Sequence, residues 1–256
     1  MTAAVPQRLL PLQGGRNFRD LGGYEAHDGR RVRWGQVFRS GSLAGLTAAD
    51  WEGLQARGVR VLCDLRTNME RQHEPFPWAQ APGISYFARD YNSSFGELRR
   101  LMSAGLPSGA VVREAMINSY RQLPFEQAPS YRRLFTHLAA NEIPMVFNCS
   151  AGKDRAGTAA ALLLGALGIP RETIVEDFEL TNSVGRLREV LGRTTGSLLS
   201  MLPGEVADAI LGADPDYIAA ALGSVEERHG SIEGYLDQVL EIDAAALERI
   251  RGNLLE

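Results

Sequence analysis

Cys149 and Arg155 stand six positions apart in the stretch FNCSAGKDRAGT, which covers residues 147–158. A cysteine thiolate is a strong nucleophile, and a guanidinium presents a planar fork of N–H donors that matches two oxygens of a phosphoryl group. Gly152 lies between them, where a tight turn can bring backbone N–H groups together. These residue types at this spacing indicate phosphoryl-transfer chemistry through a covalent intermediate on the cysteine.

The residues around this stretch predict a strand, a loop and a helix in that order. PMVFN, at 144–148, is a short apolar strand that runs directly into Cys149, and the apolar run 159–167 continues into a buried helix. The turn between them can direct its N–H groups at one point, near the positive end of the helix. Such a turn binds an anion and favours the thiolate form of Cys149.

Two plainer interpretations of this stretch are weaker. A cysteine at a strand end is often only a buried structural thiol, but the glycines and the arginine in register between a strand and a helix argue against that. The stretch also differs from the loop of P-loop NTPases, because Gly152-Lys153 is followed by Asp154 rather than by Ser or Thr. We therefore expect Cys149 to be an activated nucleophile.

The rest of the chain predicts an α/β fold. A short amphipathic helix has Thr47 as its N-cap and Gly58 just past its end, and the apolar run VRVLCDL at 59–65 follows as a buried strand. Further predicted elements are a strand at 84–91, helices at 96–106, 110–123 and 130–141, and a largely helical C-terminal region. This order indicates a small central sheet that contains parallel strands and is flanked by helices.

The composition indicates one domain over residues 1–256. The chain is 45% hydrophobic, enough for a full core, and its net charge of -4 gives no basic footprint for nucleic acid. The first residues lack the pattern of a signal peptide, and the longest apolar stretch, 156–169, is too short to span a bilayer. We expect a cytoplasmic protein with no integral membrane segment, whereas the oligomeric state stays open.

The sequence also lacks the patterns of metal sites and disulfide scaffolds. The four histidines are scattered with no pair at metal-ligand spacing, so we expect no metal and no cofactor. Only two cysteines, Cys63 and Cys149, are present, which argues for a reducing compartment.

The stretch from Cys149 to Arg155 resembles the Cys-x5-Arg signature of the cysteine-dependent protein tyrosine phosphatases. AGKDR, at 151–155, is similar to the loop of the bacterial tyrosine phosphatase family with activity on phosphoproteins and phosphoinositides. Three further blocks resemble that family in order and spacing: NFRDLGGY at 17–24, VFRSGSLAGLT at 37–47 and CDLRTNMER at 63–71. The resemblance covers most of the chain and leaves 92–130 and 182–225 without recognisable motifs, as insertions or a helical lid.

The resemblance implies hydrolysis of phosphomonoesters, first of protein phosphotyrosine, with phosphoserine, phosphothreonine or phosphoinositide head groups as further substrates. Cys149 attacks phosphorus to give a cysteinyl-phosphate, and Arg155 binds the phosphoryl group. The partners are therefore a phosphorylated protein or a phosphoinositide. The backbone amides complete the cradle, which gives as substrate-binding residues Ser150, Ala151, Gly152 and Lys153, the last adding positive charge.

Two carboxylates compete for the role of general acid. By the resemblance, Asp154 protonates the leaving oxygen and later activates water. Asp64, at the end of its own strand, is the competitor and a candidate substrate-binding residue. Its plainer interpretation is a carboxylate that holds Arg66 or a loop amide.

Two positions depart from the family pattern. The family usually has His where Asn148 stands, and Thr or Ser where Ala156 stands. The first braces the loop and the second donates a hydroxyl to the departing sulfur, so neither loss removes a reacting group. A pseudophosphatase that only binds phosphorylated partners is therefore the alternative function. A rhodanese-type sulfur transferase is a weaker third one, because the Cys-x5-Arg spacing speaks against it.

Cys63 raises one further possibility. Its strand is expected to neighbour the strand that leads to Cys149, so the two thiols could form a reversible disulfide under mild oxidation. The plainer interpretation of Cys63 is an inert buried thiol.

Overall fold

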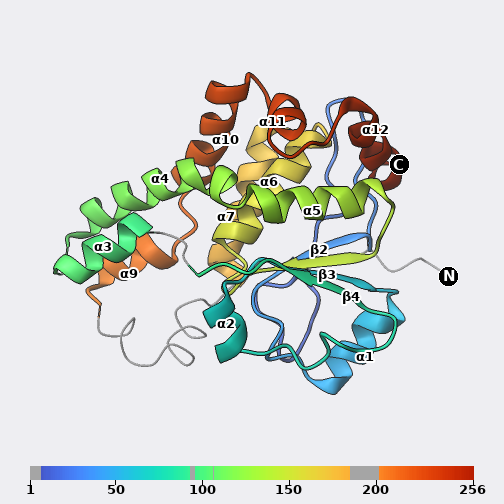
Figure 1. Cartoon of the computed structure of the whole chain (residues 1–256), viewed down its shortest axis with the longest axis horizontal. Helices are drawn as coiled ribbons and strands as arrows, with labels where there is room; N and C mark the ends of the chain where they lie inside the picture. The colour runs from blue at the N-terminus through green and yellow to red at the C-terminus, as the bar shows by residue number, and fades with distance from the viewer. Residues whose placement is uncertain (1–6, 93–95, 106, 185–201) are drawn as a thin grey trace.

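A five-stranded sheet lies at the centre of the computed structural model, which describes residues 7–92, 96–105, 107–184 and 202–256 (Figure 1). The strand order is β1-β2-β5-β3-β4. Strands β2, β5, β3 and β4 are parallel, and β1 is antiparallel to β2. The strands are β1 (Arg19–Asp20), β2 (Val37–Ser40), β3 (Val61–Asp64), β4 (Ser85–Ala88) and β5 (Met145–Asn148). The predicted sheet with parallel strands is confirmed.

The register brings the carboxyl ends of the parallel strands to one edge of the sheet. Ser40 on β2 and Asp64 on β3 both lie opposite Asn148, the last residue of β5, and Ala88 on β4 lies opposite Asp64. In open α/β sheets, ligands bind at such an edge.

Helices cover both faces of the sheet (Figure 1). One face carries α1 (Ala48–Ala56) and α2 (Asn68–His73). The other carries a thicker layer: α4 (Gly109–Glu126), α5 (Ala128–Ala139), α6 (Asp154–Ala166), α7 (Arg171–Val184), α10 (Pro215–His229), α11 (Ile232–Gln238) and α12 (Ala244–Leu254). Two further helices, α3 (Gly96–Ala104) and α9 (Gly204–Leu211), pack against α4.

Two cores result from the pleat of the strands. Successive residues of a strand point to opposite faces of its sheet. Leu62 and Val146 accordingly lie in the smaller core beside Trp51, whereas Cys63 and Phe147 lie in the larger core under the thick helical layer. Because both faces are covered, β3 and β5 are buried at every residue, which explains their continuous apolar sequences.

The predicted elements differ from the observed ones mainly at their ends. Thr47 caps α1 as predicted, through a capping box with Asp50. The helix predicted at 110–123 extends to Glu126 and contains Pro124 in its last turn. Helix α2 was not predicted.

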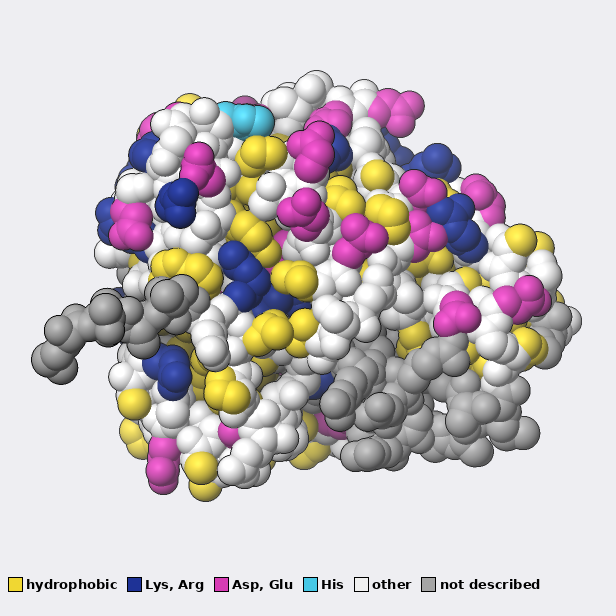
Figure 2. All heavy atoms as spheres, turned by 180° about the vertical axis from the view of Figure 1, so that it is seen from behind, with side chains coloured by type: hydrophobic (Ala, Val, Ile, Leu, Met, Phe, Trp, Pro, Cys, Tyr) yellow, Lys and Arg dark blue, Asp and Glu magenta, His cyan; other side chains and the backbone are white. Residues whose placement is uncertain are grey.

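The segments without recognisable motifs are largely helical where the structure describes them. Helices α9 and α10 both pack on α4, as a surface helical layer does. The part of the predicted lid at 185–201 lies outside the described residues. None of the described helices is long and apolar enough to cross a membrane. Seen from behind, acidic and basic side chains are mixed over the surface (Figure 2).

Candidate active site

Residues 149–155, here called the cysteine loop, join the end of β5 to the first turn of α6. The N–H of Cys149 donates to the carbonyl of Ser40 at 3.3 Å, and the N–H of Leu65 donates to the carbonyl of Asn148 at 2.8 Å. These bonds hold the loop at the edge where the parallel strands end, as the sequence predicted.

Two glycines let the cysteine loop and α6 approach their neighbours closely. Gly152 has a φ of +71°, and a Cβ there would lie 2.6 Å from the backbone nitrogen of Gly41. A Cβ on Gly157 would lie 2.9 Å from Nη2 of Arg39. A larger side chain at either position would therefore displace the loop or the arginine beneath it.

Side chains from the N-terminal segment bind the outward-facing carbonyls of the cysteine loop. The bonds run from Arg16 Nη1 to Ser150 O (3.0 Å), from Asn17 Nδ2 to Ala151 O (3.1 Å) and from Arg39 Nη2 to Gly152 O (2.8 Å). In a planar trans peptide the carbonyl and the following N–H point in opposite directions. The N–H groups of residues 151–153 therefore face the concave side of the loop, where they can bind an anion.

A buried ionic cluster supports these carbonyl-binding side chains. Asp177 on α7 pairs with Arg19 at 3.1 Å and with Arg39 at 2.6 Å, and all three side chains are at most 1% exposed. Tyr24 donates a further hydrogen bond to Asp177 at 2.9 Å. Burial alone would raise the pKa of Asp177, but the charges of Arg19 and Arg39 outweigh it and hold that pKa well below its usual range. Burial, followed by the charge of Arg19, lowers the pKa of Arg39 to about 10, so Arg39 is still charged at neutral pH, and Asp177 holds it aimed at the loop.

Arg155 forms an ion pair with Glu70 on α2. Its Nη1 and Nη2 donate to the two carboxylate oxygens of Glu70 at 2.6 and 2.7 Å, and Nη1 also donates to the hydroxyl of Tyr91 at 3.1 Å. Among the residues that the structure describes, none accepts a hydrogen bond from the buried Nε of Arg155. Burial would lower the pKa of Arg155, but Glu70 and then the charge on Cys149 raise it well above its usual value. One edge of the guanidinium is thus held, while the Nε–H remains available for a phosphoryl oxygen.

Asp154 lies at the first position of α6 with a partner that the sequence did not suggest. The hydroxyl of Tyr120, on α4, donates to Oδ1 of Asp154 at 2.7 Å. The Asp154 side chain is 18% exposed, whereas Tyr120 is fully buried. Burial, followed by the negative charge of Asp154, raises the pKa of Tyr120 well above its usual value. Tyr120 therefore stays protonated and holds one oxygen of the carboxylate.

Lys153 points away from the concave side of the cysteine loop. Its Nζ donates to the carbonyls of Ile210 at 2.5 Å and Gly212 at 3.1 Å, at the end of α9, and lies 3.2 Å from Oδ1 of Asp154. The side chain is 1% exposed. In this arrangement Lys153 connects the loop to α9, and its role in substrate binding stays a prediction.

Asp64 is occupied by its neighbours. Its carboxylate accepts three hydrogen bonds from the Arg66 side chain at 2.7–3.0 Å and one from the Tyr86 hydroxyl at 2.8 Å. It also accepts a bond from Nδ2 of Asn148 at 3.2 Å, and it is 2% exposed. In the structure Asp64 holds Arg66, as its plainer interpretation expects, and the choice of Asp154 as general acid stays a prediction.

The sequence comparisons decide the family. The profile of the tyrosine phosphatase family matches residues 10–256. The chain belongs to the tyrosine phosphatase family. A relative in Cupriavidus necator, whose name assigns it provisionally to the tyrosine-protein phosphatases, is 32% identical over 247 residues, with 93% of this chain and 85% of the relative covered. The triple specificity protein phosphatase PtpB of Mycobacterium tuberculosis is 30% identical over 277 residues, with 95% and 98% covered.

Membership of the family explains the sequence of the cysteine loop. At Asn148 and Ala156, however, this chain differs from the residues that the family usually has. Asn148 donates a hydrogen bond to Asp64 through Nδ2, while its buried Oδ1 has no partner in the described part of the chain. Ala156 is fully buried in the first turn of α6 and has no hydroxyl to offer. The nearby Thr158 hydroxyl is also buried without a partner. This tyrosine phosphatase therefore has the reacting groups of its family but lacks two of the usual groups that support them.

Both thiols are free in the structure, so the Cys63–Cys149 disulfide expected under mild oxidation stays a prediction. Cys63 lies opposite Phe147, so Cys149 is two residues further along the neighbouring strand. Strand spacing and rise together give about 8 Å between their Cα atoms, beyond the roughly 7 Å that a disulfide spans without backbone movement. Burial, followed by the charge of Asp64, also raises the pKa of Cys63 well above its usual value. The inert buried thiol fits this position better.

Four residues that support the loop were not singled out in the sequence: Glu70, Tyr120, Arg39 and Asp177. Of these, Glu70 lies in a recognisable sequence pattern. Thr67-Asn-Met-Glu70 is a capping box: the Thr67 hydroxyl accepts from the Glu70 N–H, and Glu70 accepts from the Thr67 N–H. That pattern predicts α2 and the inward direction of Glu70. Tyr120, Arg39 and Asp177 gave no comparable local signal, because long-range contacts alone bring them to the loop.

Proposed function

We propose that this tyrosine phosphatase hydrolyses protein phosphotyrosine through a cysteinyl-phosphate intermediate on Cys149. The observation that carries the proposal is the cradle itself, in which the loop carbonyls are bound from outside and Arg155 keeps its Nε free. Backbone N–H groups and the guanidinium then stabilise the charge that develops on the phosphoryl oxygens.

The proposed reaction has two displacements. The Cys149 thiolate attacks phosphorus, the ester P–O bond breaks, and the leaving oxygen takes the proton of the Asp154 carboxyl group. Water then attacks phosphorus, gives a proton to the Asp154 carboxylate, and displaces the Cys149 thiolate with release of inorganic phosphate. Both steps use groups of this chain alone.

The substrate range is a further part of the proposal. Phosphoserine, phosphothreonine and phosphoinositide head groups are included, supported by the AGKDR loop and by the similarity to a triple specificity phosphatase. We also propose a cytoplasmic location, supported by the two free thiols. A binding-only protein is the alternative, favoured by Asn148 and Ala156.

One assay separates these functions. Phosphate release is measured from p-nitrophenyl phosphate, a phosphotyrosine peptide and a short-chain phosphoinositide, with wild type and Cys149→Ser, with and without a chelator. We expect turnover by wild type alone, insensitive to the chelator. A wild type that binds the phosphopeptide but releases no phosphate would establish the binding protein instead.

A further inference from the structure

A cavity of about 160 Å³ lies beside the active site, between the ends of β3 and β4 and the first turns of α5. The residues that matter here are Arg89, just after β4, and Ser130 and Arg133, on α5. Since β3, β4 and β5 are parallel, the cavity opens at the same sheet edge as the cysteine loop. Two strand spacings separate β4 from β5, so the cavity lies about 10 Å from that loop.

The cavity is lined by two arginines and by one carboxylate, that of Asp64, which is already paired with Arg66 at 2.7 Å. Arg89 donates to the Ser130 hydroxyl at 3.1 Å and to the Glu126 carbonyl, and Arg133 lies over the Phe87 ring at 5.1 Å. Within the described part of the chain, neither guanidinium forms an ion pair with a carboxylate. The Glu126 carboxyl is the acidic group that acts on Arg89, and its pKa is raised by burial more than Arg89 lowers it.

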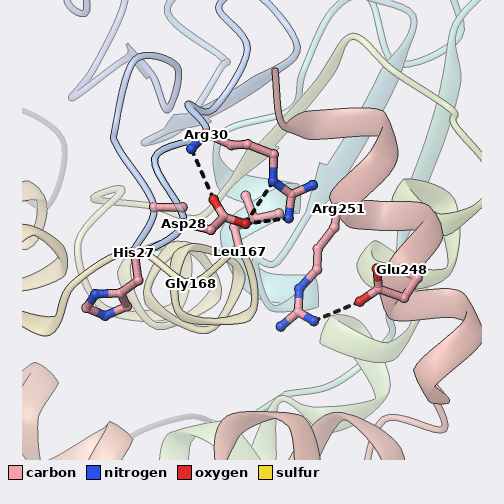
Figure 3. Close-up of a pocket in the computed structure, with 8 residues that line it drawn as sticks. His27, Asp28, Arg30, Leu167, Gly168, Glu248 and Arg251 are labelled. Atoms are coloured by element: carbon pink, nitrogen blue, oxygen red, sulfur yellow. Dashed lines mark hydrogen bonds and ion pairs between the residues drawn. The ribbon is translucent and has the colours of Figure 1, made fainter.

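A second cavity of the same size shows the opposite arrangement. It lies at the other end of α6, around Leu167 and Gly168 (Figure 3). There Arg30 pairs with Asp28 at 2.7 Å, and Arg251 pairs with Glu248 at 2.9 Å. The arginines of that cavity are already neutralised, whereas those beside the active site are free to bind an external anion.

A chain of contacts connects the first cavity to the catalytic arginine. Arg89 stacks over the ring of Tyr91 at 4.2 Å, and the Tyr91 hydroxyl accepts the hydrogen bond from Arg155. An anion in this cavity would thus lie beside a phosphoryl group held by Arg155.

We propose that Arg89, Ser130 and Arg133 form a subsite for the second phosphate group of an inositol phosphate, whose scissile phosphate lies in the cysteine loop. This deepens, and rests on, the proposed phosphatase function. Two guanidinium groups and a hydroxyl supply more hydrogen-bond donors than the two oxygens of a carboxylate ligand can accept. They are better matched to the three terminal oxygens of a phosphate group. A single inositol ring with phosphates on opposite carbons is a rigid body of the required span.

The test is a binding experiment that does not depend on turnover. Inositol 1,4-bisphosphate and inositol 1-phosphate are titrated calorimetrically into Cys149→Ser and into the same protein carrying Arg133→Ala. The preference for the bisphosphate is the Kd of inositol 1-phosphate divided by the Kd of inositol 1,4-bisphosphate. We expect Arg133→Ala to lower this ratio about tenfold, because the variant loses one charge-assisted contact. Arg132→Ala is the matched control, because Arg132 is on the same helix but pairs with Glu241. Vesicles with and without phosphatidylinositol 4-phosphate show whether the lipid headgroup is bound like the free inositol phosphate.

An unchanged ratio in Arg133→Ala, or an equal fall in Arg132→Ala, would overturn the subsite. So would an Arg133→Ala effect on a doubly phosphorylated peptide with none on the inositol bisphosphate. Failure of the proposed function would give a different result. Wild type would then release no phosphate from a phosphotyrosine peptide, while Arg133→Ala would still lower the Kd ratio.

Discussion

Glu70 and Arg155 are bound to each other through both carboxylate oxygens and both terminal guanidinium nitrogens. Glu70 also accepts hydrogen bonds from the Ser150 hydroxyl at 2.6 Å and from the Thr67 N–H at 2.7 Å. Burial alone would raise its pKa, but Arg155 and these donors lower it to about 2. The carboxylate therefore stays ionised in any neutral buffer and orients the arginine that must receive phosphate.

Replacing Glu70 with Gln keeps the shape of this contact but removes its charge. We expect kcat/KM for a phosphotyrosine peptide to fall roughly 10- to 100-fold, as the loss of one charge-assisted hydrogen bond allows, mainly through a higher KM. Steady-state kinetics would show it. If Glu70 instead competes with phosphate for Arg155, the same variant will be more active than wild type, which would reverse our assignment.

The Glu70–Arg155 pair also predicts how stability depends on pH. The pKa is depressed from 4.5 in the unfolded chain to about 2 in the folded one, so the unfolded state takes up the proton first on acidification. The contribution, on the order of 2 kcal/mol, is therefore complete above pH 4.5 and is lost as the pH falls toward 2. Urea unfolding of wild type and Glu70→Gln should differ at pH 7 and converge toward pH 2. A constant difference across this range would refute the linkage.

The covalent mechanism predicts a separation of binding from turnover. Cys149→Ser should lose turnover while still binding vanadate or phosphate, whereas Arg155→Ala should lose both, because the guanidinium contacts the phosphoryl oxygens. Residual phosphate release by Cys149→Ser above contaminant level would falsify the intermediate.

The general acid can be identified by its dependence on the leaving group. Asp154→Asn should reduce turnover of a phosphotyrosine peptide by roughly 100- to 10,000-fold and that of p-nitrophenyl phosphate much less, since p-nitrophenolate leaves without a proton. Asp64→Asn is the comparison, and it should show no such dependence. The opposite result would move the role to Asp64.

Tyr120→Phe tests the residue that positions Asp154. Loss of its hydrogen bond should lower kcat for phosphotyrosine about tenfold and that for p-nitrophenyl phosphate much less, because the general acid is then poorly positioned. Tyr217→Phe is the control, since its hydroxyl donates to the Ala209 carbonyl rather than to Asp154. A loss of stability with equal effects on the two substrates would mean that Tyr120 only packs.

Ala156 predicts slow breakdown of the intermediate. A hydroxyl at this position can bond the departing sulfur, which is worth about 1.5 to 3 kcal/mol, or roughly one to two decades in rate. Wild type should thus show a burst of p-nitrophenol before a slower steady state, and Ala156→Thr or Ala156→Ser should raise only the steady rate. With no burst and no gain, the unpartnered Thr158 hydroxyl becomes the next candidate.

The catalytic loop was predictable from the sequence, whereas its supports were not. Cys149, Gly152 and Arg155 stand close together along the chain, so their spacing alone indicated an anion cradle. Asp154 followed from the family resemblance. The sheet could be predicted because β3 and β5 are continuous apolar runs, which buried strands require.

The supports were missed because buried polar pairs leave no local pattern. In the sequence, Arg39 lies in a strand and Asp177 lies in a helix 138 positions later. In the structure, their side chains form a buried ion pair. The contacts of Lys153 with α9 gave no local pattern for the same reason. Its carbonyl partners lie at the end of α9, 57 and 59 residues away.

The bonds that Arg16 and Asn17 make to the cysteine loop span 134 residues of chain. During synthesis these two side chains emerge long before their acceptors exist, so the cradle forms only when the two halves of the protein come together. Such distant pairing places the site among the slow, late events of folding. Affinity for phosphate is therefore a measure of complete folding. A fragment that contains only the cysteine loop and α6 would have Cys149 and Arg155 but would lack the side chains that shape the loop around an anion.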